Sequence, residues 1–581
     1  MQKETPSRFD RILINLPAVR SLRDRVNALA IREAKLPDVK RAVRGIKVIG
    51  QGLGYPAGLF GREVSDKERA VWTPIFIETI NQLADIASDT KLDPVLDIAI
   101  RQALQWHKHY SKTGTKEVAT TVINALPTTI EHQLALVLHD GWGQLMFEYI
   151  RDYQAAEKRR QEWYEKVATE LIKERRSEEI VDMIESQLKA HLRAFGDFAT
   201  PSPFMWTLTK LAPEIGHIVC KRIANDPASI LNCILPVILT LMTEAEPQTA
   251  IEASRSILKA EDIATTRAVA QAYGWNRGMR PLIEGEVELL HELATHNDVF
   301  VRNSVIRAAQ FMAKDHSSIA AELLSLVRFE DSDAVAKELF STFGAHGYLK
   351  WSALTSEQAD RVWGQLGHCP DIGDYETTEF LGEISKTDPD AVLKLLKERV
   401  EYSEAHPKAE NYRAVSYTWH YSLHIRDSVS FVQFLREIRD WMAAKPTSWQ
   451  RQQMGAEIFR VVAGGFDDEV IGVLDEAVLS GTDGQLKAVG AILHKAPRTF
   501  VWDQADFVKR VLRTAAKCGE KSVNVIRGGL FAATTSGGRN GRPGQPFPED
   551  MSSGIVQPNL QEPYLQDLSK QTSIVRSRSL R

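Results

Sequence analysis

A histidine, followed thirty residues later by a His-Asp dipeptide, is the pattern of this chain that could bind metal ions. His109 and His139-Asp140 supply two imidazoles and a carboxylate, which are ordinary metal ligands in hydrolytic sites. A bound metal ion lowers the pKa of water and makes it a nucleophile at neutral pH. Asp182 and Asp197 are candidates for a further, distal carboxylate. One hypothesis is therefore a metal-dependent hydrolase.

This spacing resembles the HD phosphohydrolases, in which a His, a His-Asp pair and a distal Asp hold the metal ions. The resemblance implies a helical hydrolase that uses those ions as cofactors. However, Gly141-Trp142-Gly143 follows the dipeptide, where the family has an apolar residue, a glycine and then Lys or His. A helix that ends at His139 and is stopped by glycine explains the same residues. We therefore expect a non-enzymatic chain and keep the hydrolase as the alternative.

Closely spaced glycines follow an apolar run in residues 46–58, as they do in dinucleotide-binding loops. The strict GxGxxG pattern fails, because its last position is Tyr55 when counted from Gly50 and Ala57 when counted from Gly52. No second strand with an acidic residue follows, and the sequence contains no GxxxxGK[ST] motif. We expect a flexible glycine loop between helices, and no cofactor.

Two pairs of histidines and one His-Cys dipeptide could also supply ligands or a nucleophile. Neither histidine pair has a third ligand nearby in the sequence, so surface or interface positions are the favoured interpretation. Adjacent residues seldom point both side chains at one atom, which argues against a Cys–His nucleophile. These residues are His420 with His424, His107 with His109, and His368 with Cys369.

Helical periodicity dominates the elements that must position these residues. Apolar residues recur at i, i+3, i+4 and i+7, as in Leu96, Ala99, Ile100 and Ala103. Capping signals such as Asp93-Pro94 recur at short intervals. About two dozen helices joined by short loops predict an all-α fold.

A short motif recurs in the middle of the chain. Asp298-Val299-Phe300-Val301-Arg302 precedes an apolar helix, and Asp331-Ser332-Asp333-Ala334-Val335 follows 33 residues later. Weaker copies begin at Asp388 and Asp467, and only the first copy keeps the arginine. The motif resembles HEAT repeats, in which an Asp caps the second helix of each pair. The resemblance covers residues 201–533 and implies an α-solenoid, whose helix pairs stack to bury their apolar faces and offer a surface for partners.

The repeats also resemble the helical-repeat region of bacterial STAND-type NTPases, where that region acts as a sensor or regulatory surface. This chain lacks the P-loop, so the resemblance implies a non-catalytic scaffold, sensor or regulator that binds another protein. A bacterial NTPase or defence system is the partner that the resemblance implies. Four distant cysteines fit no disulfide framework, and residues 1–17 contain no secretory signal. With no apolar run of membrane-spanning length, we expect a cytoplasmic protein.

Positive charge is concentrated at the start of the chain. Residues 1–47 hold twelve Lys or Arg and five Asp or Glu, whereas the whole chain has a net charge of −4. Such an arm could bind phosphate, including nucleic acid, anionic lipid head groups, or an acidic surface of a partner or of this same molecule. The other interpretation is the solvated face of two helices that pack through apolar residues including Leu22 and Val26. The candidate anion or partner contacts are Arg8, Arg11, Arg20, Arg23 and Arg25.

Three segments depart from the helical-repeat pattern. Residues 151–179 are highly charged and predict a long solvated helix, with a seam too short for a coiled coil. Apolar and polar side chains alternate in residues 415–425, as they do in a half-buried strand. We favour a packed loop or short helix, because a lone strand has no partner strand to pair with. The predicted division is therefore 1–62 basic helices and glycine loop, 63–200 helical region, 201–533 HEAT-like repeats, and 534–581 a Gly/Pro-rich tail expected to be disordered.

Overall fold

A computed structural model describes residues 17–54, 66–111, 114–139, 152–196, 201–344, 347–407, 411–416 and 423–535. Within these ranges all regular secondary structure is helical, which confirms the predicted all-α fold. The chain forms two compact units, residues 1–289 and 290–581. Residues 536–581, which make up nearly all of the predicted tail, lie outside the described residues, and the boundaries at 62, 200 and 533 stay predictions.

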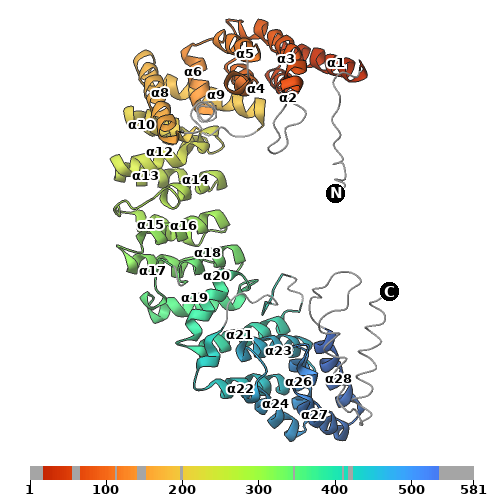
Figure 1. Ribbon diagram of the computed structural model, residues 1–581. Helices are drawn as coiled ribbons and strands as arrows, with labels where there is room; N and C mark the ends of the chain where they lie inside the picture. The colour runs from red at the N-terminus through yellow and green to blue at the C-terminus, as the bar shows by residue number, and fades with distance from the viewer. Residues whose placement is uncertain are drawn as a thin grey trace. The chain divides into compact units, whose positions relative to one another are not determined.

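The N-terminal unit consists of helices joined mostly by short connections, so that consecutive helices pack together (Figure 1). A 3-10 helix (Ile230–Cys233) precedes α12, and the division between the units falls within α15 (Glu286–Ala294). The other helices are α1 (Pro17–Ala34), α2 (Val39–Gly52), α3 (Asp66–Ala87), α4 (Pro94–Tyr110), α5 (Thr115–Asn124), α6 (Ile130–His139), α8 (Tyr153–Glu174), α9 (Ser177–Phe195), α10 (Ser202–Leu211), α11 (Glu214–Asn225), α12 (Leu235–Ala245), α13 (Pro247–Leu258) and α14 (Ile263–Tyr273).

The first five helices share one apolar core. Ile46 of α2, Phe76 of α3, Ile100 of α4 and Val122 of α5 are all buried in it. Helices α2 and α4 each begin at an aspartate whose side chain accepts a backbone N–H, and Asp93 was the cap expected for α4. Capped ends and a common core therefore hold α2 and α4 side by side.

The charged segment 151–179 forms α8, the long helix that its composition predicts. Most of its charged residues are exposed, while Tyr164, Val167 and Leu171 are buried. Lys166 and Glu170 form an i,i+4 ion pair in this helix, with 4.0 Å between Nζ and Oε1. None of the described helices is long and apolar enough to cross a membrane.

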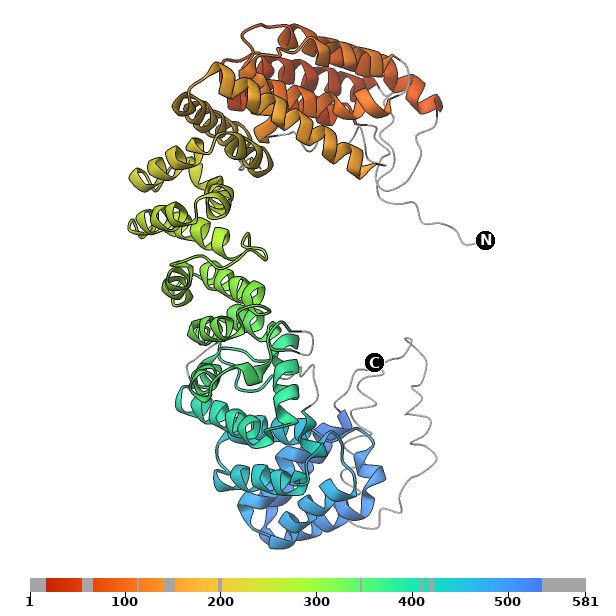
Figure 2. The same ribbon diagram turned by 90° about the vertical axis from the view of Figure 1, so that its left-hand side faces the viewer.

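In the C-terminal unit, most helices pack on the next helix but one, and several pack on the next helix (Figures 1 and 2). This is the arrangement of an α-solenoid. Its α-helices are α16 (Val299–Met312), α17 (Ser317–Leu326), α18 (Asp333–Ser341), α19 (Ser356–His368), α20 (Tyr375–Ser385), α21 (Pro389–Ala405), α22 (Phe431–Ala444), α23 (Trp449–Ala463), α24 (Asp468–Ser480), α25 (Asp483–Leu493), α26 (Phe500–Asp503), α27 (Ala505–Cys518) and α28 (Glu520–Thr535), with 3-10 helices at Trp351–Ala353 and His424–Asp427.

The HEAT-like motif links one repeat to the next. Asp298 caps α16 by accepting the N–H of Val301 at 3.2 Å, as predicted. Arg302 is buried and donates to Asp331, the first residue of the next copy, at 2.5 Å. Asp331 therefore receives the arginine of the preceding repeat, and the N-cap of α18 is Ser332 instead. The predicted caps Asp388 and Asp467 do begin α21 and α24.

One local prediction needs correction. Gly50 and Gly52 lie inside α2 rather than in a loop, because the helix continues to Gly52. In the segment 415–425, Val415 and Ser416 are both buried, and His424 begins a 3-10 helix. Its described residues thus form a packed loop and a short helix, which confirms the favoured interpretation for that part.

Candidate functional site

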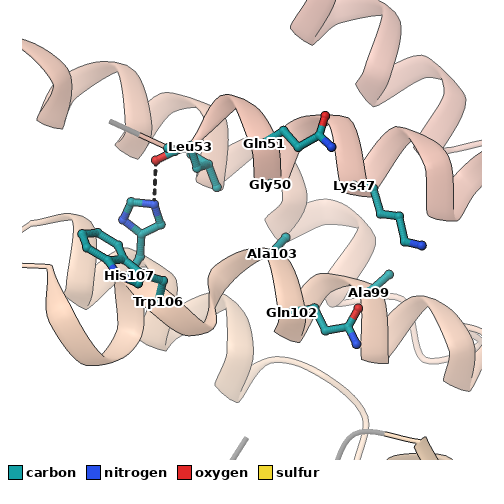
Figure 3. A pocket seen from close by; sticks show the side chains of 10 residues that line it. Lys47, Gly50, Gln51, Leu53, Ala99, Gln102, Ala103, Trp106 and His107 are labelled. Carbon is teal, nitrogen blue, oxygen red and sulfur yellow. Dashed lines mark hydrogen bonds between the residues drawn. The ribbon is translucent and has the colours of Figure 1, made fainter. Parts of the chain in front are cut away.

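A groove of about 360 Å³ runs between α2 and α4 in the N-terminal unit (Figure 3). The helices approach closely at its floor because Gly50 has no side chain: a Cβ atom there would lie 3.0 Å from Cβ of Ala103. A close crossing of this kind leaves the longer side chains on either side as rims. The groove is lined by Lys47, Gly50, Gln51, Leu53, Gly54, Ala99, Gln102, Ala103, Trp106 and His107.

The imidazole of His107 is held on both sides by the fold. Its Nε2 lies 3.0 Å from the carbonyl oxygen of Leu53, and its Nδ1 lies 2.8 Å from the hydroxyl of Ser111. Because the carbonyl only accepts, Nε2–H donates to Leu53 and Nδ1 accepts from Ser111. Burial lowers the pKa of His107, which keeps the ring neutral. His107, for which a surface or interface position was predicted, is therefore buried and links α4 to the end of α2.

The rim of the groove combines a cation with an aromatic ring. The ammonium group of Lys47 lies 4.5 Å from the ring centroid of Phe195, in the range of a cation–π interaction. Trp106 is 40% exposed and meets His107 edge to face at 5.0 Å. Figure 3 shows Lys47, Gln51 and Gln102 with their polar ends extending from the two helices. The groove thus offers an apolar floor beside polar and positive groups.

The hairpin of α1 and α2 carries most of the positive charge predicted for the N-terminal arm. Residues 17–52 contain nine Lys or Arg and three Asp or Glu. Arg41 pairs with Glu33 at 2.6 Å, and Asp38 caps α2, so two of the three carboxylates are already engaged. Five exposed cations form no ion pair in the part of the chain that the structure describes. These are Arg20, Arg25, Arg32, Lys40 and Arg44.

Only part of the predicted basic set faces solvent. Arg20 and Arg25 are exposed on α1, and Arg8 and Arg11 lie outside the described residues. Arg23 points inward instead and donates to the carbonyl of Gly52 at 3.3 Å. Its guanidinium lies 5.3 Å from the centroid of Trp72, and burial lowers its pKa. Arg23 therefore stabilises the carbonyl end of α2.

The residues of the alternative hydrolase are only partly described. Asp140 and Asp197 lie outside the described residues, and Asp182 accepts from Arg222 at 2.7 Å. The ring of His139 stacks on His191, with centroids 4.0 Å apart. Among the described residues, no three His, Cys, Asp or Glu are grouped as metal ligands would be. The HD arrangement of His109, His139 and Asp140 stays a prediction.

Acidification is expected to weaken the contact between α6 and α9 through His139. Burial, and then the neighbouring His191, lower the pKa of His139 to about 2. The unfolded chain therefore binds a proton below pH 6.5 that the folded chain does not bind. The free energy of unfolding should fall by about 1.4 kcal/mol for each pH unit below that value. Hydrogen exchange of α6 and α9 between about pH 5 and 7.5 measures this loss.

A His139→Phe variant provides the control, because phenylalanine keeps a stacked ring and removes the titrating group. Its protection in α6 and α9 should fall less steeply with pH than that of the wild type. Equal slopes in the two proteins would contradict the assignment to His139.

The remaining histidine and cysteine candidates do not form a reactive pair. Cys369 is buried, its Sγ donates to the carbonyl of Asp371 at 3.4 Å, and burial raises its pKa to about 12. The ring of His368 packs on Tyr402 at 4.8 Å. His424 lies 3.3 Å from Asp427, and His420 lies outside the described residues. A thiol this hard to ionise is a poor nucleophile.

The helices and their packing define the class of protein: this chain is a helical-repeat protein of the α-solenoid type. No protein-family model matches the chain, and no curated protein matches it. Among solved structures, an engineered protein matches with 14% identity and a TM-score of 0.20, over 88% of this chain and 100% of that one. UNC-45 from Drosophila melanogaster matches with 10% identity and a TM-score of 0.26, over 88% of this chain and 77% of that one. TM-scores this low do not establish a shared fold, so the classification as an α-solenoid is based on the helix packing of this chain.

Proposed function

We propose that this chain is a non-catalytic helical-repeat protein whose N-terminal unit binds an acidic protein partner. The observation that supports this proposal most directly is the surplus of positive charge on the α1–α2 hairpin, where five exposed cations form no ion pair with a described residue. Exposed charges of one sign attract and orient a partner of the opposite sign. The neighbouring α2–α4 groove supports a binding role rather than a catalytic one. Both ring nitrogens of His107, the histidine that lines the groove, are engaged in hydrogen bonds within the fold and are not free for acid–base chemistry.

A protein partner is favoured over nucleic acid by the composition of the hairpin. Residues 17–52 contain no Phe, Tyr or Trp, so the cations are not interleaved with the stacking platforms that single-stranded nucleic acids use. The α2–α4 groove has an apolar floor beside Lys47 and Trp106, and such a floor can accommodate an apolar side chain of a protein partner. The second candidate is binding to a phosphate backbone, which the same five cations favour.

The narrower form of the proposal assigns a scaffold, sensor or regulatory role beside a bacterial NTPase or defence protein. Its support is the resemblance of the repeat motifs alone. A cytoplasmic location belongs to the same proposal and is supported by the four cysteines, all of which are free.

Removing the unpaired cations is expected to release the partner. The partner is first identified by cross-linking to the full-length wild-type chain in its native cells, and is then purified. The test variant carries Arg25→Gln, Arg32→Gln, Lys40→Gln and Arg44→Gln. Because each exposed charge contributes a few tenths of a kcal/mol or more, affinity for the purified partner should fall about tenfold. Titration calorimetry at physiological salt measures the change.

The matched control makes the same change in net charge on α8 and α9, with Lys158→Gln, Lys166→Gln, Lys173→Gln and Lys189→Gln. All four of these lysines are exposed. The control should bind within about twofold of the wild type. The proposal would be overturned if the chain retained no protein but bound duplex DNA or RNA with an affinity that falls steeply with salt.

A further inference from the structure

An exposed apolar stripe runs along α1. Leu22 is 60% exposed, Val26 43% and Leu29 53%. Their spacing of four and three residues aligns the three side chains on one face of the helix. Sequence reasoning placed Leu22 and Val26 in the packing face of α1, and the structure corrects that prediction.

Helix α1 packs on α2 through the side that borders the stripe, so the described residues leave the stripe itself uncovered. Asn27, Ala30 and Ala34 are buried. Gly45 of α2 comes so close that a Cβ atom there would lie 2.5 Å from the carbonyl oxygen of Ala30. Small residues and a glycine thus complete the α1–α2 contact without the larger side chains. The stripe contributes nothing to that core.

The position of α1 makes an apolar stripe unusual. It is the first described helix of the N-terminal unit and lies at the edge of that unit, beside α2 and α3 (Figure 1). Terminal helices of repeat proteins normally present a polar outer face, because no further repeat covers them. An apolar face in that position is typical of a surface that a partner covers.

Charge identifies the kind of partner. Arg25 and Arg32 lie three residues after Leu22 and Leu29, so both guanidinium groups border the same side of the stripe. Both are exposed and form no ion pair with described residues. A second copy of α1 would bring the same cations to the contact. Residues 1–16 of the chain itself hold three Lys or Arg and only two Asp or Glu. Neither a second copy of α1 nor residues 1–16 therefore supplies a row of carboxylates to face Arg25 and Arg32.

We infer that the exposed face of α1 binds an acidic amphipathic helix of a partner protein. This inference rests on the proposed function and specifies how it is achieved. Apolar residues of the partner at i, i+4 and i+7 cover Leu22, Val26 and Leu29, as in other helix-on-helix recognition. Aspartate or glutamate residues along the border of that face meet Arg25 and Arg32.

Designed helical peptides of about 20 residues test the inference against the full-length chain by fluorescence anisotropy. The first probe has leucines on one face and glutamates along the border. The second replaces the glutamates with lysine, and the third replaces the leucines with serine. We expect binding of the first peptide only. Equal binding of the first and third peptides would overturn the inference, because charge alone would then suffice.

Variants of α1 locate the binding site. Leu22→Ser with Leu29→Ser should weaken binding of the first peptide at least about tenfold, since two buried leucine contacts are lost. Arg25→Glu with Arg32→Glu should weaken it similarly and allow the lysine peptide to bind. Ala28→Ser is the matched control, because Ala28 is exposed outside the stripe and serine adds only one atom beside the neighbouring Arg25 and Arg32. This variant should leave the affinity unchanged. Unchanged affinity in the leucine variant would also overturn the inference.

Two other occupants give distinct results. Dimers in sedimentation that vanish in the leucine variant would assign the stripe to a second copy. Hydrogen exchange of α1 that is slow in the full chain and fast after deletion of residues 1–16 would assign it to the chain itself, and either result overturns the inference. If the leucine variant still binds the partner identified by cross-linking, the inference fails while the proposed function stands. If no protein partner is found, the proposed function fails whatever the peptides do.

Discussion

Replacing Arg399 with methionine is expected to lower the free energy of unfolding of the C-terminal unit by at least about 3 kcal/mol. Arg399, on α21, is fully buried, and its guanidinium donates to the carbonyls of Ala414 at 3.0 Å and Arg413 at 2.8 Å. It also donates to Leu366 and Gly367 at the end of α19. Methionine fills similar space and donates nothing, so several buried carbonyls lose their partners. Urea unfolding followed by circular dichroism measures the loss.

Arg413→Ala is the control for the Arg399 variant. The Arg413 side chain is largely exposed and lies 3.3 Å from Asp371, and such pairs contribute less than about 1 kcal/mol. Its backbone carbonyl, which Arg399 uses, stays in place. A loss below about 1 kcal/mol in Arg399→Met would show that water or a rearranged loop can satisfy the carbonyls instead.

Two adjacent glycines of α28 should respond in opposite directions to the same substitution. A Cβ atom on Gly529 would lie 2.2 Å from the carbonyl oxygen of Gly490 on α25, whereas nothing lies within 4 Å of one on Gly528. Gly529→Ala should therefore destabilise the unit by about 2 kcal/mol through overpacking. Gly528→Ala should stabilise it by about 0.5–1 kcal/mol, because alanine loses less backbone entropy in a helix.

Each glycine variant serves as the control of the other, since both make the same chemical change at adjacent positions of one helix. Urea titration gives the free energies, and hydrogen exchange shows whether Gly529→Ala loosens α28 first. Stabilisation by Gly529→Ala would mean that α25 and α28 do not cross at Gly490.

Local chemistry explains which parts of the fold the sequence could predict. Asp93, Asp298, Asp388 and Asp467 cap their helices as expected, because an N-cap depends only on the next two or three residues. The role of Asp331 was mistaken, because Ser332 is an equally good cap. The acceptor of Arg302 lies 29 residues further along the chain, a distance over which periodicity gives no information.

The candidate groove was missed for a related reason. Closely spaced glycines are typical of loops, and Gly50 and Gly52 were interpreted in that way. The structure uses Gly50 for a close crossing of α2 with Ala103 of α4, about fifty residues away. His107 likewise finds its acceptor at Leu53. The signal that could have suggested the crossing is the small residue Ala103 on the packing face of α4.

The arginine links between repeats limit how freely this array could be shortened or extended. Arg302 reaches Asp331 across 29 residues, whereas Arg426 reaches Asp467 across 41. The donors and acceptors are therefore set at unequal intervals, unlike those of consensus repeats that can be exchanged as identical cassettes. Excising the segment that contains Asp331 would leave Arg302 buried without its carboxylate. The repeats that these two arginines join are thus each fitted to one particular neighbour.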